Sequence, residues 1–414
     1  MSLSRLLAGI DALPMDHDRH RDVHGELPRR RPAELVVELE RSGLRGRGGG
    51  AFPLAIKLAA VRRGAGSPVL VINGAESEPM STKDRLLMWC APHLVIDGAV
   101  SLADAAGAQE LVFCLDELEP RIHESLHREI GRRAENRRLA MRIIETPNGY
   151  VTGHESAIVH WHNDGIATPL PNPPRVTERG IGRRPTFVAN VETVAHVALI
   201  ARHGADWFRS VGTEADPGTA LITLSGAVVD PGVYEIAHGE PLGSLLRAAG
   251  GANRPIRAFL MGGYGGGWID AADLPKLQLS RAQLRPFGAR LGPGVVVALG
   301  EDACPVAEVA RVAGWLSAQS AGQCGPCING LAAIAEAMAS IRDGEDPGTL
   351  KRIARWCELV TGRGACAHPD GAADFISSAL RVFGAELVDH AQFGRCDGCD
   401  APPVLTLSGT HAVH

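Results

Sequence analysis

Hydrophobic and polar positions along the first half of the chain predict strands and helices in alternation. Apolar runs at residues 67–74 and 110–115 are short and end in polar turns, which indicates buried strands. Apolar positions with helical spacing occupy residues 32–41, 55–61 and 86–107, and the last of these stretches reads as a single helix. The alternation continues to about Leu199, which favours a mainly parallel α/β sheet.

The pattern changes twice in the second half. From Gly218 to about residue 300, short apolar runs separated by Asp-Pro-Gly and glycine turns predict a small α+β domain. Its glycine cluster MGGYGGGWI is interpreted as a tight turn rather than a second phosphate site. Residues 303–387 have helical periodicity, and the remaining tail has none, so we expect the tail to be loosely structured.

Composition narrows the class of protein. The chain has 414 residues, of which 45% are hydrophobic, which is enough for several domains with their own cores. Its formal charge of -5 comes from intermixed acidic and basic residues, so we expect no nucleic-acid partner. The sequence has no long apolar run and no signal-peptide pattern at its start, and we therefore expect a cytoplasmic protein without direct membrane insertion.

A glycine-rich loop precedes the helix predicted at residues 55–61. Five glycines between Ser42 and Lys57 would let a phosphate approach backbone N–H groups at a helix start, and Arg47 or Lys57 could add charge. A purely structural turn is an equal alternative for such a loop. It is not a dinucleotide fingerprint, because no strand immediately precedes it.

Six of the nine cysteines lie in the last quarter of the chain. Cys324 and Cys327 form a CxxC pair, and Cys366 follows with 38 residues between, a pattern that suits an iron-sulfur cluster or zinc. Cys357 lies on an apolar helical face and is interpreted as core packing, as are Cys90 and Cys114.

Four motifs in order carry a resemblance to a known family. They are GLRGRGGGAFP with Lys57, VINGAESEPMSTKDR, GYVTGHESAI and PTFVANVETV. Together they resemble the FMN- and NADH-binding subunit of respiratory complex I, the 51-kilodalton-type flavoprotein, with features of the Rnf-complex C subunit. The resemblance extends over residues 36–385.

The resemblance implies a fold and domain boundaries. It predicts an N-terminal extension over 1–30, a Rossmann-like FMN- and NADH-binding α/β domain over 31–210, and a β-grasp domain of the SLBB type over 216–300. A helical iron-sulfur domain would follow over 301–387, and a tail with a second CxxC pair over 388–414.

The resemblance also implies site residues. The expected FMN contacts are Gly46, Arg47, Gly48, Gly49, Lys57, Asn73, Tyr150, Gly153, Asn190 and Thr193. The expected neighbours of NADH are Phe52, Glu76, Glu78 and Glu155, with Glu155 as the catalytic choice that orients the nicotinamide or the flavin edge. The alternative for the acidic segment is a solvated, salt-bridged turn that includes Glu76, Glu78 and residues 83–85.

Several positions depart from the family pattern. Ala75, His154 and Ala189 replace polar groups of the flavin site, and Ala60 and Arg175 replace aromatic residues that stack on the dinucleotide. Arg175 and His154 could instead accommodate the extra phosphate of NADPH, which is a hypothesis about specificity.

The family holds a four-iron cluster with four cysteines, and this chain has Ala321 at the first ligand position. Cys324, Cys327 and Cys366 would then hold a 4Fe-4S or a 3Fe-4S cluster. Cys396 and Cys399 are candidates to complete it. Alternatively, they could form a zinc site with Cys324 and Cys327, or a redox-active dithiol.

The resulting hypothesis is an NADH-dependent FMN oxidoreductase. It would take hydride from NADH and pass electrons to a ferredoxin or other iron-sulfur protein, and a larger redox complex is a further candidate partner. One alternative is an FMN and iron-sulfur relay within a larger redox complex, without its own NADH site. The other is a degenerate binding or scaffold protein that is poor in cofactors.

Overall fold

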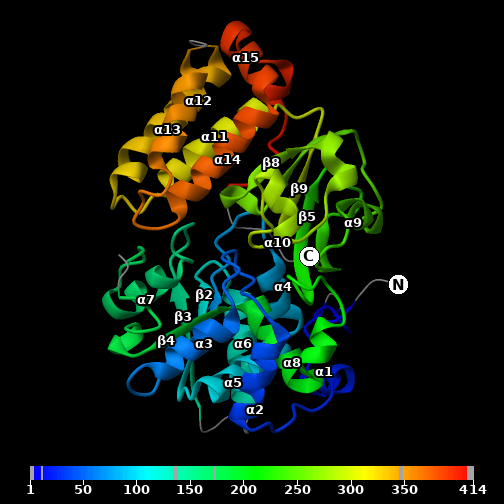
Figure 1. The fold of residues 1–414 in the computed structure, drawn as a ribbon, viewed down its shortest axis with the longest axis vertical. Helices are drawn as coiled ribbons and strands as arrows, with labels where there is room; N and C mark the ends of the chain where they lie inside the picture. Colours follow the sequence, from blue (N-terminus) through cyan, green and yellow to red (C-terminus); the bar gives the residue numbers. More distant parts are fainter. Residues whose placement is uncertain (1–3, 11–12, 134–138, 171–173, 345–347, 408–414) are drawn as a thin grey trace.

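The structure is a computed structural model, and it describes residues 4–10, 13–133, 139–170, 174–344 and 348–407. In Figure 1 the N-terminal α/β part lies at the bottom, a second sheet lies above it on the right, and a group of helices lies at the top. The mixed α/β architecture with a C-terminal helical region, which the sequence predicts, is confirmed.

The N-terminal part contains eight helices and four strands in the described residues. They are α1 (His17–His24), α2 (Pro32–Ser42), α3 (Leu54–Arg63), β1 (Val69–Gly74), α4 (Lys83–Cys90), α5 (Pro92–Ala106), β2 (Glu110–Asp116), α6 (Pro120–Arg132), β3 (Ala140–Thr146), α7 (Glu155–Asp164), β4 (Thr186–Asn190) and α8 (Val191–Arg209). Local signals set the bounds of α2: Pro32 stands at its first turn, Glu34 completes a capping box, and Gly43 ends the helix at φ 68°.

The four strands form a parallel sheet in the order β3-β2-β1-β4. The chain moves outward from β1 to β2 and β3, and then returns to place β4 on the other side of β1. The strand order therefore reverses between β1 and β4. In open α/β sheets a crevice forms at such a point, outside the carboxyl ends of the strands.

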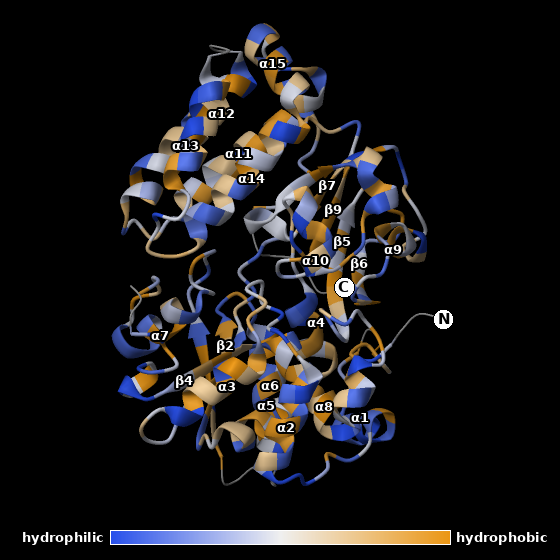
Figure 2. Cartoon of the chain, viewed as in Figure 1, coloured by the Kyte–Doolittle hydropathy of each residue, from blue (hydrophilic) through white to orange (hydrophobic). Residues whose placement is uncertain are grey.

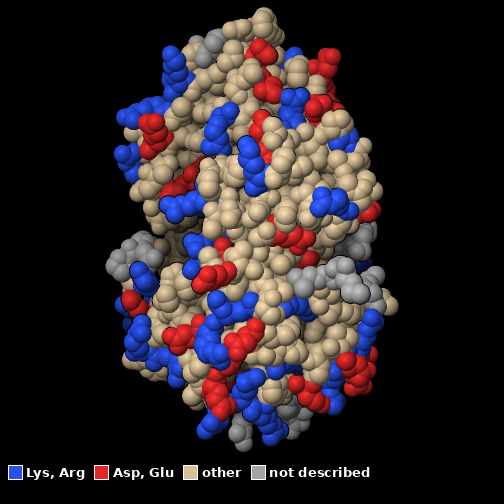
Figure 3. All heavy atoms as spheres, turned by 45° about the vertical axis from the view of Figure 1, so that its right-hand side comes forward, with Lys and Arg blue, Asp and Glu red and all other residues tan. Residues whose placement is uncertain are grey.

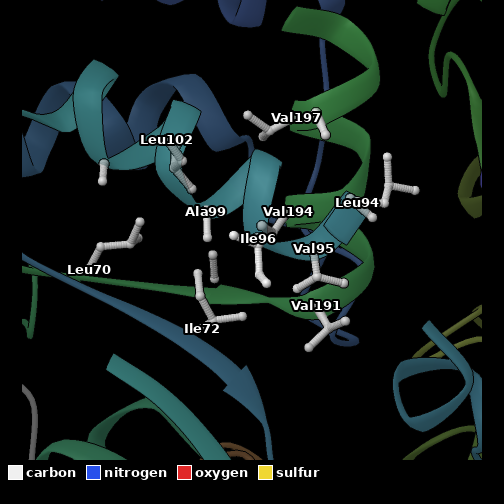
Figure 4. Close-up of a cluster of buried hydrophobic side chains, with 14 of the residues drawn as sticks. Leu70, Ile72, Leu94, Val95, Ile96, Ala99, Leu102, Val191, Val194 and Val197 are labelled. Atoms are coloured by element: carbon white, nitrogen blue, oxygen red, sulfur yellow. The ribbon is translucent and has the colours of Figure 1, made fainter. Parts of the chain in front are cut away.

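Helices cover both faces of this sheet. Leu70 and Ile72 of β1 face α5 and α8, as Figure 4 shows, whereas Val69 and Val71 pack with Ile158 of α7 on the other face. Helices α5 and α8 approach so closely that a Cβ on Gly98 would lie 1.9 Å from the Val194 carbonyl oxygen. Glycine is required there by packing.

The single helix expected over 86–107 is wrong. The chain bends by 98° between α4 and α5 at Ala91, because Pro92 cannot continue the hydrogen-bond ladder of the preceding helix. Among the described residues no single helix is long and apolar enough to cross a membrane. The bent pair α4 and α5 meets the length and composition criteria only together.

The second sheet has the order β6-β5-β9-β7-β8, with β5 and β9 parallel and the other pairs antiparallel. Its elements are β5 (Thr219–Gly226), β6 (Gly232–Ala237), α9 (Leu242–Ala248), β7 (Ile256–Met261), β8 (Gly267–Asp270), α10 (Arg281–Leu284) and β9 (Val295–Gly300). Side chains alternate along β7: Phe259 packs with α9, while Leu260 faces the C-terminal helices. The glycine cluster forms the turn between β7 and β8, as predicted.

The C-terminal helices are α11 (Pro305–Ala318), α12 (Ala332–Asp343), α13 (Thr349–Val360), α14 (His368–Val382) and α15 (Gly384–Phe393). The segment after α15 is packed rather than loose. Leu405 is fully buried, and the backbone N–H groups of Val404 and Leu405 donate to the Glu308 carboxylate. The expectation of a loosely structured tail is therefore wrong as far as residue 407.

Hydropathy and charge follow this arrangement. Figure 2 shows hydrophobic residues concentrated on the sheets and the helix faces packed against them, while α1 is mostly hydrophilic. On the face drawn in Figure 3, Lys and Arg are interspersed with Asp and Glu. That face offers no single-signed surface for a polyanion.

Candidate functional site

The site forms where the strand order of the parallel sheet reverses. Asn73 is the next-to-last residue of β1, Asn190 ends β4, and the two residues are partners in the register of these strands. Asn73 Nδ2 donates to the Gly153 carbonyl oxygen at 2.9 Å. Asn190 caps α8 by accepting from the Glu192 N–H at 3.1 Å. Two amide side chains thus border the crevice.

A cavity of about 460 Å³, here called the small cavity, opens above these strand ends. Its lining comes from the glycine-rich loop, the strand ends, residues 150–154, the β7–β8 turn, residues 290–293 and the start of α14. Of the predicted site residues it is lined by Gly48, Gly49, Asn73, Glu76, Glu78, Tyr150, Gly153 and Asn190.

A second cavity of about 1270 Å³, the large cavity, lies beside it. Phe52, Lys57 and Glu155 line it, as do Ala60 and Arg175, which stand where the family has aromatic residues. The two cavities share the lining residues Gly50, His154, Cys366 and Ala367. A cysteine of the helical domain therefore borders both.

The glycine-rich loop is closed by backbone pairing. Arg45 and Pro53 form an isolated bridge, and the Gly46 N–H donates to the Phe52 carbonyl oxygen at 2.9 Å. A Cβ on Gly48 would lie 3.2 Å from the Asn190 side chain, so a larger residue would press on the end of β4. The loop thus brings backbone into the small cavity.

Two predicted contacts of FMN hold this loop in place from behind. The Arg47 N–H donates to Thr193 Oγ1 at 2.8 Å, and the Arg47 guanidinium donates to the Thr219 carbonyl oxygen at 3.0 Å. Arg47 and Gly46 line a separate cavity of about 280 Å³ rather than the small one. In this arrangement Arg47 and Thr193 join the loop to α8 and β5.

Lys57 and Glu155 form an ion pair in the wall of the large cavity. Lys57 Nζ also donates to the Val188 carbonyl oxygen at 2.7 Å, so both α7 and β4 fix its position. Beside them, desolvation lowers the pKa of His154; the Glu155 carboxylate opposes this shift, and the Lys57 ammonium adds to it. The lowered pKa favours the neutral imidazole of His154.

The acidic segment after β1 is buried, so the alternative of a solvated turn is wrong. Glu76 accepts from the N–H groups of Asp84 and Arg85 at 3.1 and 3.0 Å and thus caps α4. Lys83 is 1% exposed and pairs with Asp84 and Glu192 at 2.8 and 2.9 Å. This network holds the β1–α4 loop and the start of α8 together.

Glu78 is the group in the small cavity best suited to meet a ligand. Its Oε2 accepts from the Tyr264 N–H at 3.0 Å and from the Tyr150 hydroxyl at 3.3 Å, while Oε1 is buried without a partner. Burial raises the pKa of Glu78 to about 7. An unpartnered buried oxygen beside a glycine-lined space fits a polar ligand that donates to it.

The cysteine pattern of the helical domain is brought together in space. Burial raises the pKa of the Cys327 thiol to about 11. The Ser320 hydroxyl opposes the shift, whereas the neighbouring Cys324 and Cys366 thiols add to it. The Cys324 and Cys366 thiols are thus near enough to Cys327 to influence its pKa, and Ala321 offers no thiol.

Cys396 and Cys399 do not join this group, so the expectation that they complete it or share zinc with Cys324 and Cys327 is wrong. Cys399 Sγ lies 3.5 Å from Cys304 Sγ. Cys304 caps the start of α11, whereas Ser320–Cys327 follows its end. Because α11 has 14 residues, the two places are about 20 Å apart.

Several lining residues of the small cavity come from outside the predicted motifs. They are Gly262, Gly265, Arg290, Pro293, His368, Asp370 and Gly371. The glycine cluster of the β7–β8 turn was the sequence signal for Gly262 and Gly265, and it was interpreted as structural alone.

Comparison with known proteins agrees with this geometry. Residues 39–199 match the Nuo51 FMN-binding domain family, residues 221–259 the SLBB domain, and residues 307–390 the NADH-ubiquinone oxidoreductase-F iron-sulfur binding region.

Full-length relatives match over most of both chains. The second F-type subunit of the NADH-quinone oxidoreductase of Rhizobium meliloti is 33% identical and is matched over 88% of this chain and 90% of its own length. The corresponding F-type subunit of Streptomyces coelicolor is 32% identical over 91% and 86%. A crystal structure of an NAD⁺-reducing [NiFe]-hydrogenase in the air-oxidised state superposes with a TM-score of 0.85 at 28% identity, covering 98% of this chain and 69% of that chain.

Proposed function

This chain belongs to the family of F-type subunits of NADH-quinone oxidoreductase, and from that premise we propose that it oxidises NADH and passes the electrons to an iron-sulfur acceptor such as a ferredoxin. The observation that carries the proposal is the convergence of the two cavities at Cys366. A nucleotide site, a flavin site and a cluster ligand then adjoin one another, which is the order that electrons would follow.

We assign the flavin to the small cavity. Asn73 and Asn190 at the strand ends offer donors and acceptors to a ring edge, and the unpartnered Oε1 of Glu78 can accept from a flavin donor. FMN, when bound, supplies the conversion between two-electron and one-electron chemistry that oxidation of NADH and reduction of a cluster require.

The large cavity would take the nicotinamide nucleotide. Phe52 is half exposed in its wall and can cover an aromatic face. The ion pair of Glu155 with Lys57 fixes that carboxylate in the wall of the large cavity, next to His154, which lines both cavities; there it would orient the nicotinamide against the flavin. The lowered pKa of His154 favours the form of its ring that adds no charge there.

Cys324, Cys327 and Cys366 would hold the cluster, which then lies on the electron exit side of the small cavity. Three thiolates leave one iron of a four-iron cluster without a cysteine, or suit a three-iron cluster. The relatives are named as subunits of NADH-quinone oxidoreductase, which supports the proposal that this chain acts within a larger redox complex.

One observation favours a second candidate, the relay without its own NADH site. Ala60 and Arg175 line the large cavity in place of the family's aromatic residues, so stacking on the nucleotide is weaker. Steady-state reduction of ferredoxin under anaerobic conditions separates the two. If the proposal is correct, NADH alone supports the reduction of ferredoxin. Reduction of ferricyanide by NADH checks that the flavin itself turns over. Activity with a reduced partner protein but none with NADH would favour the relay.

A further inference from the structure

Four metal-ligating side chains gather at the end of α11 that is remote from the two cavities. Cys304 and His390 are buried, Cys399 is half-buried and Cys396 is exposed. Their ligand atoms all lie within 4.8 Å of one another. Cys304 Sγ is 3.4 Å from His390 Nε2 and 3.5 Å from Cys399 Sγ, and the Sγ atoms of Cys396 and Cys399 are 3.9 Å apart.

These spacings suit one tetrahedral metal ion. With Zn–S bonds of about 2.3 Å and Zn–N bonds of about 2.0 Å, tetrahedral angles place two sulfurs about 3.8 Å apart and a sulfur and a nitrogen about 3.5 Å apart. The observed separations lie close to these values. We propose that Cys304, His390, Cys396 and Cys399 bind one Zn²⁺ ion in a closed, structural Cys₃His site.

The surroundings of the four groups fit this role. His390 Nδ1 lies 3.2 Å from the Arg342 carbonyl oxygen, and donation to that oxygen leaves Nε2 free to bind a metal. Cys304 caps α11 and accepts from the Ala307 N–H at 3.3 Å, so the helix start stabilises a thiolate there. Binding of Zn²⁺ to three thiols and a neutral imidazole releases three protons and changes no oxidation state.

A disulfide or dithiol is the competing interpretation of the CxxC pair. It uses two sulfurs and gives no role to His390, whose ring is oriented by the Arg342 carbonyl, or to Cys304, which contacts both His390 and Cys399. The arrangement of four ligands, contributed by the start of α11, α15 and the CxxC turn, favours the metal.

The ion would fasten the C-terminal segment to the body of the protein. After the CxxC turn, Val404 and Leu405 bind Glu308 of α11, and the carbonyl oxygen of Thr406 accepts from the Tyr264 hydroxyl at 2.5 Å. The Tyr264 N–H in turn donates to Glu78 in the small cavity. The zinc site therefore anchors the C-terminal segment, residues 404–406, which packs behind the small cavity.

The test is element analysis of the full-length protein, purified anaerobically from cells supplied with both zinc and iron. We expect one zinc per chain in addition to the cluster iron. The extended X-ray absorption fine structure at the zinc edge should show three sulfur neighbours at about 2.3 Å and one nitrogen at about 2.0 Å.

Cys396→Ser is the informative variant, because this side chain is exposed and its loss disturbs no packing. Zinc retained after dialysis against a chelator should fall at least about tenfold, with iron and FMN unchanged. Cys366→Ser is the matched control, which should lower iron and leave zinc at the wild-type level. Wild-type protein without zinc, iron in place of zinc at this site, or equal zinc in Cys396→Ser would overturn the proposal.

Discussion

Tyr150 and Glu78 meet at the junction of the three parts of the molecule, where the Tyr150 hydroxyl donates to Glu78 Oε2 at 3.3 Å. The Tyr150 ring packs edge-on against Trp315 of α11, with ring centroids 5.3 Å apart. The contact thus links the loop after β1 to the helical domain, and it buries a carboxyl group in the wall of the proposed flavin site.

This burial predicts a pH dependence of stability. The pKa of Glu78 is raised from 4.5 to about 7, so the native protein holds this proton more tightly than the unfolded chain does. The free energy of unfolding should therefore fall as the pH rises from 4.5 to 7, by about 3 kcal/mol from this group. In flavin-free protein, Glu78→Gln should raise the Tm at pH 8 and not at pH 5. Glu358→Gln, at an exposed carboxylate, should shift neither value; a Glu78→Gln effect of equal size at both pH values would refute the assignment.

The Lys57–Glu155 pair predicts that a substitution at Glu155 impairs the reaction with NADH without impairing FMN binding. Glu155→Gln removes the charge that we propose orients the nicotinamide, while Lys57 stays bonded to Val188. We expect kcat/KM for NADH to fall about a hundredfold, with FMN content unchanged. Asp206→Asn, at an exposed carboxylate on α8 that pairs with Arg41 outside the large cavity, is the control and should keep wild-type kinetics. Wild-type kinetics in Glu155→Gln would remove Glu155 from the mechanism.

Gly153 is a position where backbone approach leaves no room for a side chain. A Cβ there would lie 2.5 Å from Ser77 Oγ and 3.0 Å from the Ala75 carbonyl oxygen. Gly153→Ala should displace this wall of the small cavity and lower FMN occupancy at least about tenfold, measured by fluorescence of released flavin. Gly131→Ala in α6 meets no atom within 4 Å and should retain flavin and stabilise the helix. Full flavin content in Gly153→Ala would contradict the location of the site.

Because Ala321 stands at a ligand position of the family, we expect a cysteine there to stabilise the cluster. Ala321→Cys restores a fourth thiolate beside Cys324, so the variant should retain iron longer on exposure to air, as followed by the visible cluster absorption. Ala318→Cys, three residues earlier and exposed, adds a thiol without adding a ligand. Equal iron loss from Ala321→Cys and wild type would mean that the fourth coordination position is already filled.

The position of Arg175 predicts that this side chain affects the preference for NADPH over NADH. It is exposed and lines the large cavity, so its charge can meet the extra phosphate of NADPH. Arg175→Ala should lower the ratio of kcat/KM for NADPH to that for NADH about tenfold. Arg62→Ala, on α3 outside the large cavity, should leave the ratio unchanged. If NADPH supports no more activity with wild type than a blank without nucleotide, the hypothesis fails.

The sequence predicted local elements and order well because its signals were local. Helix α2 begins at Pro32 and ends before Gly43, and two of the short apolar runs form β1 and β2. The bend at Ala91 was missed because an apolar stretch with helical spacing continues across Pro92. The family motifs indicated part of the lining of the two cavities, but not that the Arg47 N–H donates to Thr193 Oγ1 beside them.

Contacts between distant segments could not be predicted in the same way. The partners of Cys396 and Cys399 are set by how α15 and the tail pack onto the start of α11, and no spacing along the chain specifies that packing. Likewise, the contribution of Gly262 and Pro293 to the small cavity depends on how the second sheet sits on the first domain.

The most direct test of the proposed function is an anaerobic absorption spectrum of the purified protein, with FMN and iron quantified, before and after addition of NADH. We predict a flavin band that bleaches on addition of NADH, accompanied by iron in the same preparation. Bound flavin that remains oxidised in the presence of excess NADH would contradict the proposed NADH oxidation.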